Sequence, residues 1–194
     1  MKDITENEMK FVLAILKDPK QDFNANSMAS LLGMSRMGTL NIAKKLEKEG
    51  IISSKEMGKA NFLKLKLDRH FARQYVKFLL LKEAESAHPY VKAALGDIRK
   101  LKSAEGAVLF GSVLKKHQEA HDMDVLLILD KKKFKALQKE IDRLNQTAIK
   151  RIHPIFQTIE DIQENIRAEN PAMLNAIKGI VAFGEDSYLE GVRI

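Results

Sequence analysis

Two short apolar segments in the second half of the chain, residues 107–110 and 125–129, most constrain the fold. The first runs directly into Gly111-Ser112, and the second follows Asp122-Met123-Asp124. Apolar runs of this length, bounded by glycine and polar residues, are typical of buried strands. Residues two apart on a strand project to the same face. The pattern therefore predicts a sheet in which Asp122 and Asp124 point together from one strand.

The segments around these two strands alternate between helical and strand-like periodicity. The spacing of apolar residues predicts helices over 90–101, 131–144, 159–168 and 171–178, a third strand over 152–156 and a last apolar run over 180–184. Strands that alternate with helices favour an α/β or α+β domain with a mixed sheet.

The chemistry predicted for this domain rests on the two carboxylates and the glycine. Mg²⁺ prefers oxygen ligands and commonly uses one or two carboxylates together with substrate phosphates. Gly111 at a strand end allows a phosphate to approach the backbone without hindrance from a Cβ atom. A helix starting near Ser112 would offer free N–H groups to an anion. These parts together suit metal-assisted nucleotidyl transfer.

This order of residues resembles the DNA polymerase beta-like nucleotidyltransferase superfamily, especially its small stand-alone branch, the minimal nucleotidyltransferases. The resemblance rests on residues 109–113 and 121–127 and covers residues 88–194. It implies that Gly111 and Ser112 bind the triphosphate of an NTP. It also implies that Asp122 and Asp124 bind Mg²⁺, with Mn²⁺ as an alternative metal, and act in catalysis.

Two departures from the family pattern bear on activity. The family places a third carboxylate on a later strand, but residues 152–157 contain no Asp or Glu, and His153 and Gln157 are the nearest polar residues. His153 is a candidate catalytic base, and a cap at a strand end is the alternative. Lys115 is a candidate phosphate ligand, with solvated surface as the alternative. Further candidates in the polar loop are Lys116, His117, Glu119 and His121.

The first half of the chain has a different organisation. Apolar spacing predicts helices over 5–16 and 26–32 and a third from 35 to about 49, with Thr5, Asn26 and Ser35 as caps. Glu8, three residues after Thr5, completes a capping-box pattern. A short strand at 51–54, a turn at 56–59 and an alternating segment at 61–67 follow.

Three helices followed by a hairpin form the order of a winged helix-turn-helix. Residues 32–52 resemble winged-helix repressors of the MarR and ArsR kind, through the Ser35 cap, the Leu46-Glu47 pair and the exit at 49–52. By position on the third helix and the wing, the candidate DNA contacts are Arg36, Thr39, Asn41, Lys45, Lys55, Lys59 and Asn61.

The charge distribution supports double-stranded DNA as the partner of this half. Residues 1–83 carry 16 Lys and Arg against 10 Asp and Glu, whereas residues 84–194 carry 17 against 16. A domain that contacts proteins is the alternative. An apolar helix over 68–85 connects the halves, and its stripe indicates packing against the flanking domains or a homodimer interface.

The composition excludes several classes of protein. The chain has no Cys, so disulfides and thiolate metal sites are impossible. It has no apolar run of about 20 residues and no signal-peptide pattern, so we expect a cytoplasmic protein with no membrane partner.

The overall expectation is an α+β chain. It has a winged helix over 1–68, a connecting helix over 69–87 and a nucleotidyltransferase-like α/β domain with a mixed sheet over 88–194. The main functional hypothesis is a DNA-binding nucleotidyltransferase that acts on an unknown hydroxyl acceptor. The alternatives are a transcriptional regulator with a degenerate, nucleotide-sensing transferase domain and, as the resemblance implies, an antitoxin-like role with a protein partner.

Overall fold

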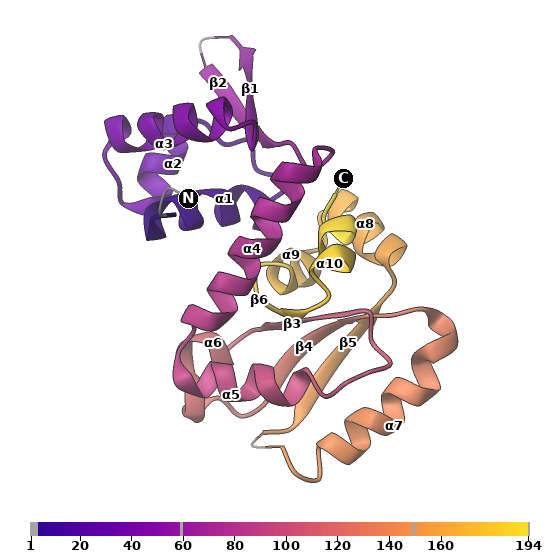
Figure 1. Ribbon diagram of the computed structural model, residues 1–194. Coiled ribbons are helices and arrows are strands. Elements are labelled where there is room, and N and C mark those ends of the chain that lie inside the picture. Colours follow the sequence, from indigo (N-terminus) through magenta and orange to yellow (C-terminus); the bar gives the residue numbers. More distant parts are fainter. Residues whose placement is uncertain (1–3, 59, 149, 194) are drawn as a thin grey trace. The chain divides into compact units, whose positions relative to one another are not determined.

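The computed structural model describes residues 4–58, 60–148 and 150–193. The chain divides into two compact units, Met1–Leu79 and Leu80–Ile194, and each is described by itself (Figure 1). In the described residues, no helix combines the length and apolarity that crossing a bilayer requires.

The first unit has the element order predicted for a winged helix. It contains α1 (Glu6–Lys17), α2 (Ala25–Leu32), α3 (Arg36–Lys48), β1 (Ile52–Met57) and β2 (Ala60–Leu65). β1 and β2 pair as an antiparallel hairpin with Ile52 opposite Leu65. Leu63 is buried and Lys64 is exposed, as the alternating pattern predicts, whereas Leu67 lies beyond the end of β2.

Local capping residues set the starts of these helices. The side chains of Thr5 and Ser35 accept hydrogen bonds from the N–H groups of Glu8 and Gly38, which confirms both predicted caps. The predicted cap Asn26 is wrong. Asn24 caps α2 instead, because its side chain accepts from the N–H groups of Asn26 and Ser27 in a complete capping box.

A buried polar cluster joins three helices of the first unit. The Glu8 side chain has other partners than the capping box predicted for it. Its carboxylate lies 2.6 Å from Lys45 Nζ and accepts a hydrogen bond of 2.5 Å from the Tyr75 hydroxyl. Only 2% of Glu8 is exposed. Burial and the neighbouring Glu8 carboxylate both raise the pKa of Tyr75 far above its ordinary value.

The helix predicted between the halves is present as α4 (His70–Ser86). Val76, Leu79 and Leu80 are fully buried, so this part of the apolar stripe packs as predicted. Phe71 and Phe78, which belong to the same predicted stripe, are 64% and 46% exposed.

The second unit is an α/β arrangement around one sheet. Its helices are α5 (Pro89–Ile98), α6 (Val113–Lys116), α7 (Phe134–Leu144), α8 (Ile159–Arg167), α9 (Pro171–Ala176) and α10 (Glu185–Gly191), with 3₁₀ turns at His117–Glu119 and Lys131–Lys133. Its strands are β3 (Gly106–Phe110), β4 (Met123–Ile128), β5 (Ile152–Gln157) and β6 (Ile180–Phe183). The sequence pattern did not predict α10, and it placed the start of α7 at the 3₁₀ turn.

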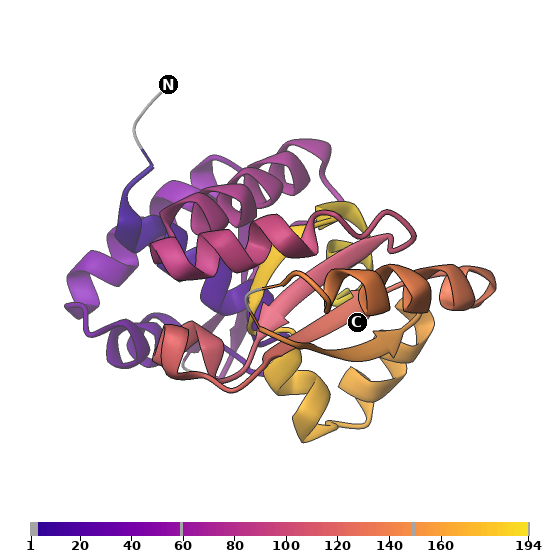
Figure 2. The same ribbon diagram turned by 90° about the horizontal axis from the view of Figure 1, so that it is seen from below.

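The sheet is mixed, as predicted, with strand order β5-β4-β3-β6. β4 runs parallel to β5, whereas β3 is antiparallel to both β4 and β6. One face of the sheet packs against α5 and α7, and helices α8, α9 and α10 cover the other face (Figures 1 and 2). Strands buried on both faces explain the continuous apolar runs in the sequence.

Candidate functional site

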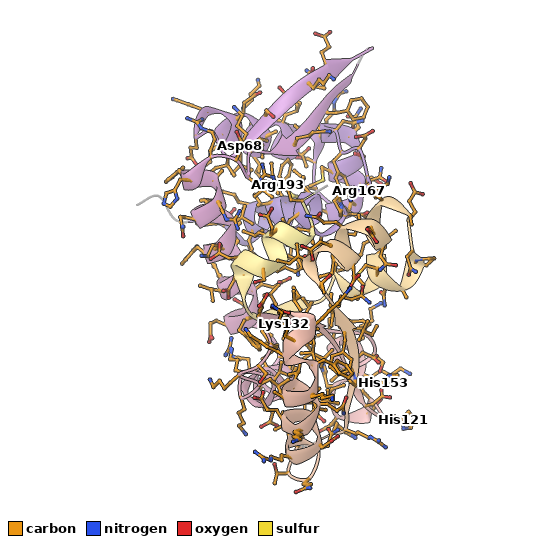
Figure 3. The ribbon with its side chains drawn as sticks, turned by 90° about the vertical axis from the view of Figure 1, so that its right-hand side faces the viewer. Asp68, His121, Lys132, His153, Arg167 and Arg193 are labelled. Carbon is orange, nitrogen blue, oxygen red and sulfur yellow. The ribbon has the colours of Figure 1, made fainter. Side chains whose placement is uncertain are left out.

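Asp122, Asp124 and His153 meet at one end of the sheet in the second unit. One ligand atom from each of the three residues lies within 4.8 Å of the others, and the His153 Nδ1 atom is 3.3 Å from Asp124 Oδ1. The side chains of Asp124 and His153 are 28% and 73% exposed, so the cluster is open to solvent. Figure 3 labels His153 together with His121, the residue before Asp122.

The strand register brings His153 to the carboxylates. β4 and β5 are parallel, and Asp124 lies directly opposite His153 in their register. β5 is at the edge of the sheet, where Pro154 is tolerated because its missing N–H costs no central ladder bond. Asp122 precedes the first residue of β4, and Asp124 is its second residue. The two carboxylates converge as predicted, with Asp122 just before the strand and Asp124 within it.

His153 occupies the place where the sequence pattern lacks a third carboxylate. At this end of the sheet, the described residues offer His153 as the third potential metal ligand, with no further Asp or Glu in the group. The two carboxylates and an imidazole fit a divalent cation by their donor atoms. The ligand atoms lie at most 4.8 Å from one another, which is close to twice a metal–oxygen distance of about 2.1 Å.

Gly111 joins this cluster to the turn after β3. Its φ angle is +81°, in the left-handed region that favours glycine, and an added Cβ would lie 2.1 Å from Asp124 Oδ2. Ser112 is the N-cap of α6, and its side chain makes no capping hydrogen bond. Gly111 is therefore required both by the backbone conformation and by the space that Asp124 occupies.

A cavity of about 580 Å³ borders this turn. Its lining includes Gly111, Ser112 and Lys115, which the sequence singled out as nucleotide-binding candidates, together with Lys116. Asn175 and Lys178 also line it, and sequence reasoning missed both. Their contribution could not be found from spacing, because α9 follows the Gly-Ser turn by some sixty residues.

The other candidates in the polar loop do not join the carboxylates. His117 stacks on the ring of His88 with a centroid distance of 3.9 Å, and its Nδ1 atom is buried with no hydrogen-bond partner among the described residues. Glu119 and His121 are exposed and lie outside the metal-ligand group that the described residues form.

In the first unit, the exposed face of α3 carries part of the predicted DNA contacts. Arg36 and Asn41 are exposed, as are Lys44 and Lys48, which the sequence analysis passed over. Positions 37, 41, 44 and 48 recur at helical spacing, so a helical projection would have found the two lysines. Lys55 and Asn61 are exposed on the hairpin, whereas Lys59 lies outside the described residues.

One predicted DNA contact, Thr39, is wrong, and a second, Lys45, is engaged in an ion pair. Thr39 is fully buried, and its hydroxyl donates to backbone carbonyl oxygens, at 2.9 Å for Arg36 and 3.1 Å for Ala25. Lys45 pairs with the buried Glu8 carboxylate at 2.6 Å. That carboxylate raises the pKa of Lys45 through its hydrogen bond. Thr39 is thus used for packing, whereas the Lys45 side chain, 31% exposed, is held by its ion pair with Glu8.

The hairpin is tied to α3 by a side chain of that helix. Glu47 Oε1 accepts hydrogen bonds from Ser54 N–H at 3.2 Å and from the Ser54 hydroxyl at 2.6 Å. Ser54 lies in β1, so the base of the wing is fixed against the end of α3. This contact sets the direction of the wing relative to the exposed face of α3.

Comparisons with known proteins give weak likenesses. No protein-family model matches the chain, and no curated protein is significantly similar to it. Among solved structures, the chain is similar to MepR, a transcription regulator of the Staphylococcus aureus multidrug efflux pump MepA, with a TM-score of 0.36 and 12% identity over 50% of this chain and 77% of MepR. It is also similar to the heme sensor protein PefR from Streptococcus agalactiae in complex with heme, with a TM-score of 0.37 and 14% identity over 76% of each chain. TM-scores below 0.5 carry no argument about fold or function here.

Proposed function

We propose that the chain is a DNA-binding regulator whose second unit binds a nucleotide together with a divalent metal. The observation that carries the DNA part is the exposed basic face of α3, formed by Arg36, Lys44 and Lys48 beside Asn41. Arg and Asn side chains read base edges in the major groove, whereas Lys mostly contacts phosphate. The positive charge of the first half supplies the sequence-independent attraction.

The nucleotide part of the proposal is supported by the cluster at the end of β4. Asp122, Asp124 and His153 would hold Mg²⁺ or Mn²⁺, which, when bound, neutralises negative charge on phosphate oxygens. Gly111 leaves its backbone open toward the adjacent cavity. We assign this unit to binding because the position opposite Asp124 is held by an imidazole instead of a third carboxylate.

Binding of the full chain to duplex DNA tests the first part. Fluorescence anisotropy with a labelled random-sequence duplex should give an affinity that falls steeply with salt, because bound Lys and Arg release condensed counterions. Arg36→Ala and Lys44→Ala should each weaken binding. Lys139→Ala, an exposed lysine of α7, is the matched control. Binding that is absent, or equal in all variants, would contradict the proposal.

A second candidate function is nucleotidyl transfer, favoured by the two carboxylates that the cluster retains. In that reaction an acceptor hydroxyl oxygen forms a bond to the α-phosphorus of the NTP. The bond from that phosphorus to the α,β-bridging oxygen breaks, and pyrophosphate leaves with the electron pair. In this alternative His153, 73% exposed beside Asp124, would not hold the metal and would instead accept the hydroxyl proton.

Incubation with α-labelled NTP, Mg²⁺ or Mn²⁺ and a cell extract separates the two functions. Label on any macromolecule that is lost in Asp124→Asn would establish transfer. Metal-dependent NTP binding without label transfer would support the regulatory function. The homodimer and the protein partner expected from the sequence stay predictions.

A further inference from the structure

The outer face of α7 carries a concentration of cations that has no role in the proposed function. Of the 17 Lys and Arg in residues 84–194, six fall within residues 131–143, which contain only two acids, whereas the other residues of this range carry 11 against 14. All six are exposed, and we call them the α7 basic face: Lys131, Lys132, Lys133, Lys135, Lys139 and Arg143. Of the two acids, Glu140 accepts a hydrogen bond from the Ser103 hydroxyl and Asp142 accepts one from Gln138.

The fold directs this face away from the second unit. The apolar stripe of α7 is buried in the core and consists of Leu137, Ile141 and Leu144. Lys135, Lys139 and Arg143 recur every fourth residue and lie on the opposite side of the helix. They form a row about 12 Å long, at a rise of about 1.5 Å per residue. Figure 1 shows α7 at the outer margin of this unit, so an extended surface can approach the row.

Local electrostatics disfavours cations at these positions. A helix N-terminus favours acidic residues, yet the first turn of α7 contains none and follows the three lysines of the 3₁₀ turn at 131–133. Like charges four residues apart on a helix repel each other, and Lys139 has a cation at that spacing on both sides, Lys135 and Arg143. Departures from such local rules are expected at functional sites. The row therefore indicates a partner that supplies negative charge.

The chain itself does not neutralise the centre of the face. Lys131 lies 3.9 Å from Asp161, and Lys133 lies 3.4 Å from Glu105. Among the described residues, the lysines of the face that form no ion pair are Lys132, Lys135 and Lys139. Their charges are thus open to an external anion.

An exposed aromatic ring lies within the same basic segment. Phe134, between Lys133 and Lys135, is 44% exposed, and its ring packs edge-on against Phe156 with a centroid distance of 4.9 Å. A phosphodiester backbone offers no apolar surface to such a ring, whereas the boundary between lipid headgroups and acyl chains does. Lysine is also depleted at protein–protein interfaces. Lysines around one exposed ring therefore favour an anionic lipid surface over a nucleic acid or a protein.

We propose that the α7 basic face docks on an anionic phospholipid membrane, with its lysines at the headgroup phosphates and Phe134 at the headgroup boundary. Clusters of about four to eight Lys and Arg on an amphipathic helix are typical of anionic-lipid recognition. This contact replaces the expectation of no membrane partner, which followed from the lack of an apolar run of about 20 residues. A peripheral contact needs no spanning segment.

Co-sedimentation of the full chain with vesicles of phosphatidylcholine, alone or mixed in equal parts with phosphatidylserine, tests the proposal. Binding is expected only to the mixed vesicles and should weaken as salt rises. The double variant Lys135→Gln, Lys139→Gln should bind them roughly twentyfold more weakly, from about fivefold for each lysine removed. The double variant Lys64→Gln, Lys102→Gln removes the same charge from exposed positions outside α7 and is expected to bind as the wild type does.

Two further variants report on the ring and on folding. The chain contains no Trp, so Phe134→Trp supplies a single fluorescent reporter on this face. Its emission is expected to shift to shorter wavelength with the mixed vesicles and to stay unchanged with phosphatidylcholine alone. Lys135→Glu is expected to raise the melting temperature, because an acid is favoured in the first turn of a helix, and to weaken vesicle binding.

Four outcomes would overturn the proposal. Equal losses of vesicle binding in the two double variants would show that net charge alone drives binding. An unshifted emission of vesicle-bound Phe134→Trp would remove the ring from the contact. A lower melting temperature of Lys135→Glu would assign the lysine to folding. If Lys135→Gln, Lys139→Gln weakens binding of a duplex or of a single-stranded oligonucleotide as much as binding of vesicles, the face belongs to nucleic acid.

Discussion

Gly111 lies so close to Asp124 that a methyl group on its Cα atom would stand 2.1 Å from a carboxylate oxygen. Gly111 directly follows β3 and Asp124 lies in β4, and Phe110, the residue before Gly111, is the register partner of Asp124. The turn that faces the cavity and the carboxylate cluster are therefore one rigid unit. A side chain added at Gly111 would therefore displace the Asp124 carboxylate.

Gly111→Ala is expected to abolish metal-dependent nucleotide binding. The added methyl group would push Asp124 out of the cluster, and alanine is strained at a φ angle of +81°. The measurement is the thermal shift of the full chain with ATP and Mg²⁺. Gly96→Ala is the control, because that exposed glycine of α5 has nothing within 4 Å of an added Cβ. A thermal shift in Gly111→Ala as large as that of the wild type would contradict the proposed metal and nucleotide site.

The cluster is expected to prefer Mn²⁺ to Mg²⁺. Mg²⁺ requires oxygen ligands in near-ideal octahedral geometry, whereas an imidazole nitrogen suits transition metals better. His153→Asp should therefore raise the affinity for Mg²⁺ and reduce the preference for Mn²⁺, as measured by titration calorimetry. His153→Ala should weaken Mn²⁺ binding. If the ratio of Mn²⁺ affinity to Mg²⁺ affinity is the same in the wild type and in both variants, His153 is not a metal ligand.

Replacing Lys44 and replacing Lys45, its neighbour on α3, are expected to affect different properties, DNA binding and stability respectively. Lys45→Met removes the cation that pairs with the 2%-exposed Glu8 carboxylate, so it should lower the melting temperature of the protein. Lys44→Met leaves stability nearly unchanged and should weaken DNA binding instead. Calorimetry and anisotropy on the same pair of variants check this. A Lys45→Met protein as stable as the wild type would refute the structural role of the ion pair.

The capping box of α8 is expected to make stability depend on acid pH. Hydrogen bonds from the Thr158 backbone N–H, 3.0 Å from Asp161 Oδ2, and from its side chain lower the pKa of Asp161 below its ordinary value of 3.8. A carboxyl group with a lowered pKa adds stability above the unfolded-state pKa, and this stability is lost as pH falls through the folded-state pKa.

The free energy of unfolding of Asp161→Asn should thus be lower than that of the wild type near neutral pH by about 0.3–1 kcal/mol, the usual range for a carboxylate at a helix N-terminus, because asparagine keeps an acceptor oxygen but loses the charge. The difference should shrink as pH falls below 3.8 and the wild-type carboxyl becomes protonated. Urea denaturation at a series of pH values measures it. A difference that stays constant down to the lowest pH would mean that the charge of Asp161 has no part in the cap.

Local patterns in the sequence predicted the features that local physics decides. Ser35 and Thr5 cap their helices because a helix start needs an acceptor for its free N–H groups, whatever surrounds it. Gly33 has a φ angle of +63° at the end of α2, as the rule for helix C-termini predicts. Strand periodicity predicted that Asp122 and Asp124 point together, and they do, although Asp122 lies one residue before β4.

Features decided by tertiary contacts could not be predicted. Thr39 and Lys45 are helical residues of a basic segment, and only the packing of α1 and α2 shows that both are used inside the unit. Asn24 and Asn26 are equally good caps by type, and the choice between them depends on Ser27 completing the box. Lys178 enters the candidate site through the packing of Gly179 on β3.

The parallel register that sets His153 opposite Asp124 also has a genetic consequence. Codons for histidine and aspartate differ by one nucleotide at the first position, so a single point mutation at this codon would create a three-carboxylate cluster. The surrounding sheet would need no rearrangement, because His153 is already exposed at an edge strand with its neighbours in place. A change of this one codon would therefore convert a cluster with one nitrogen ligand into a cluster with oxygen ligands only.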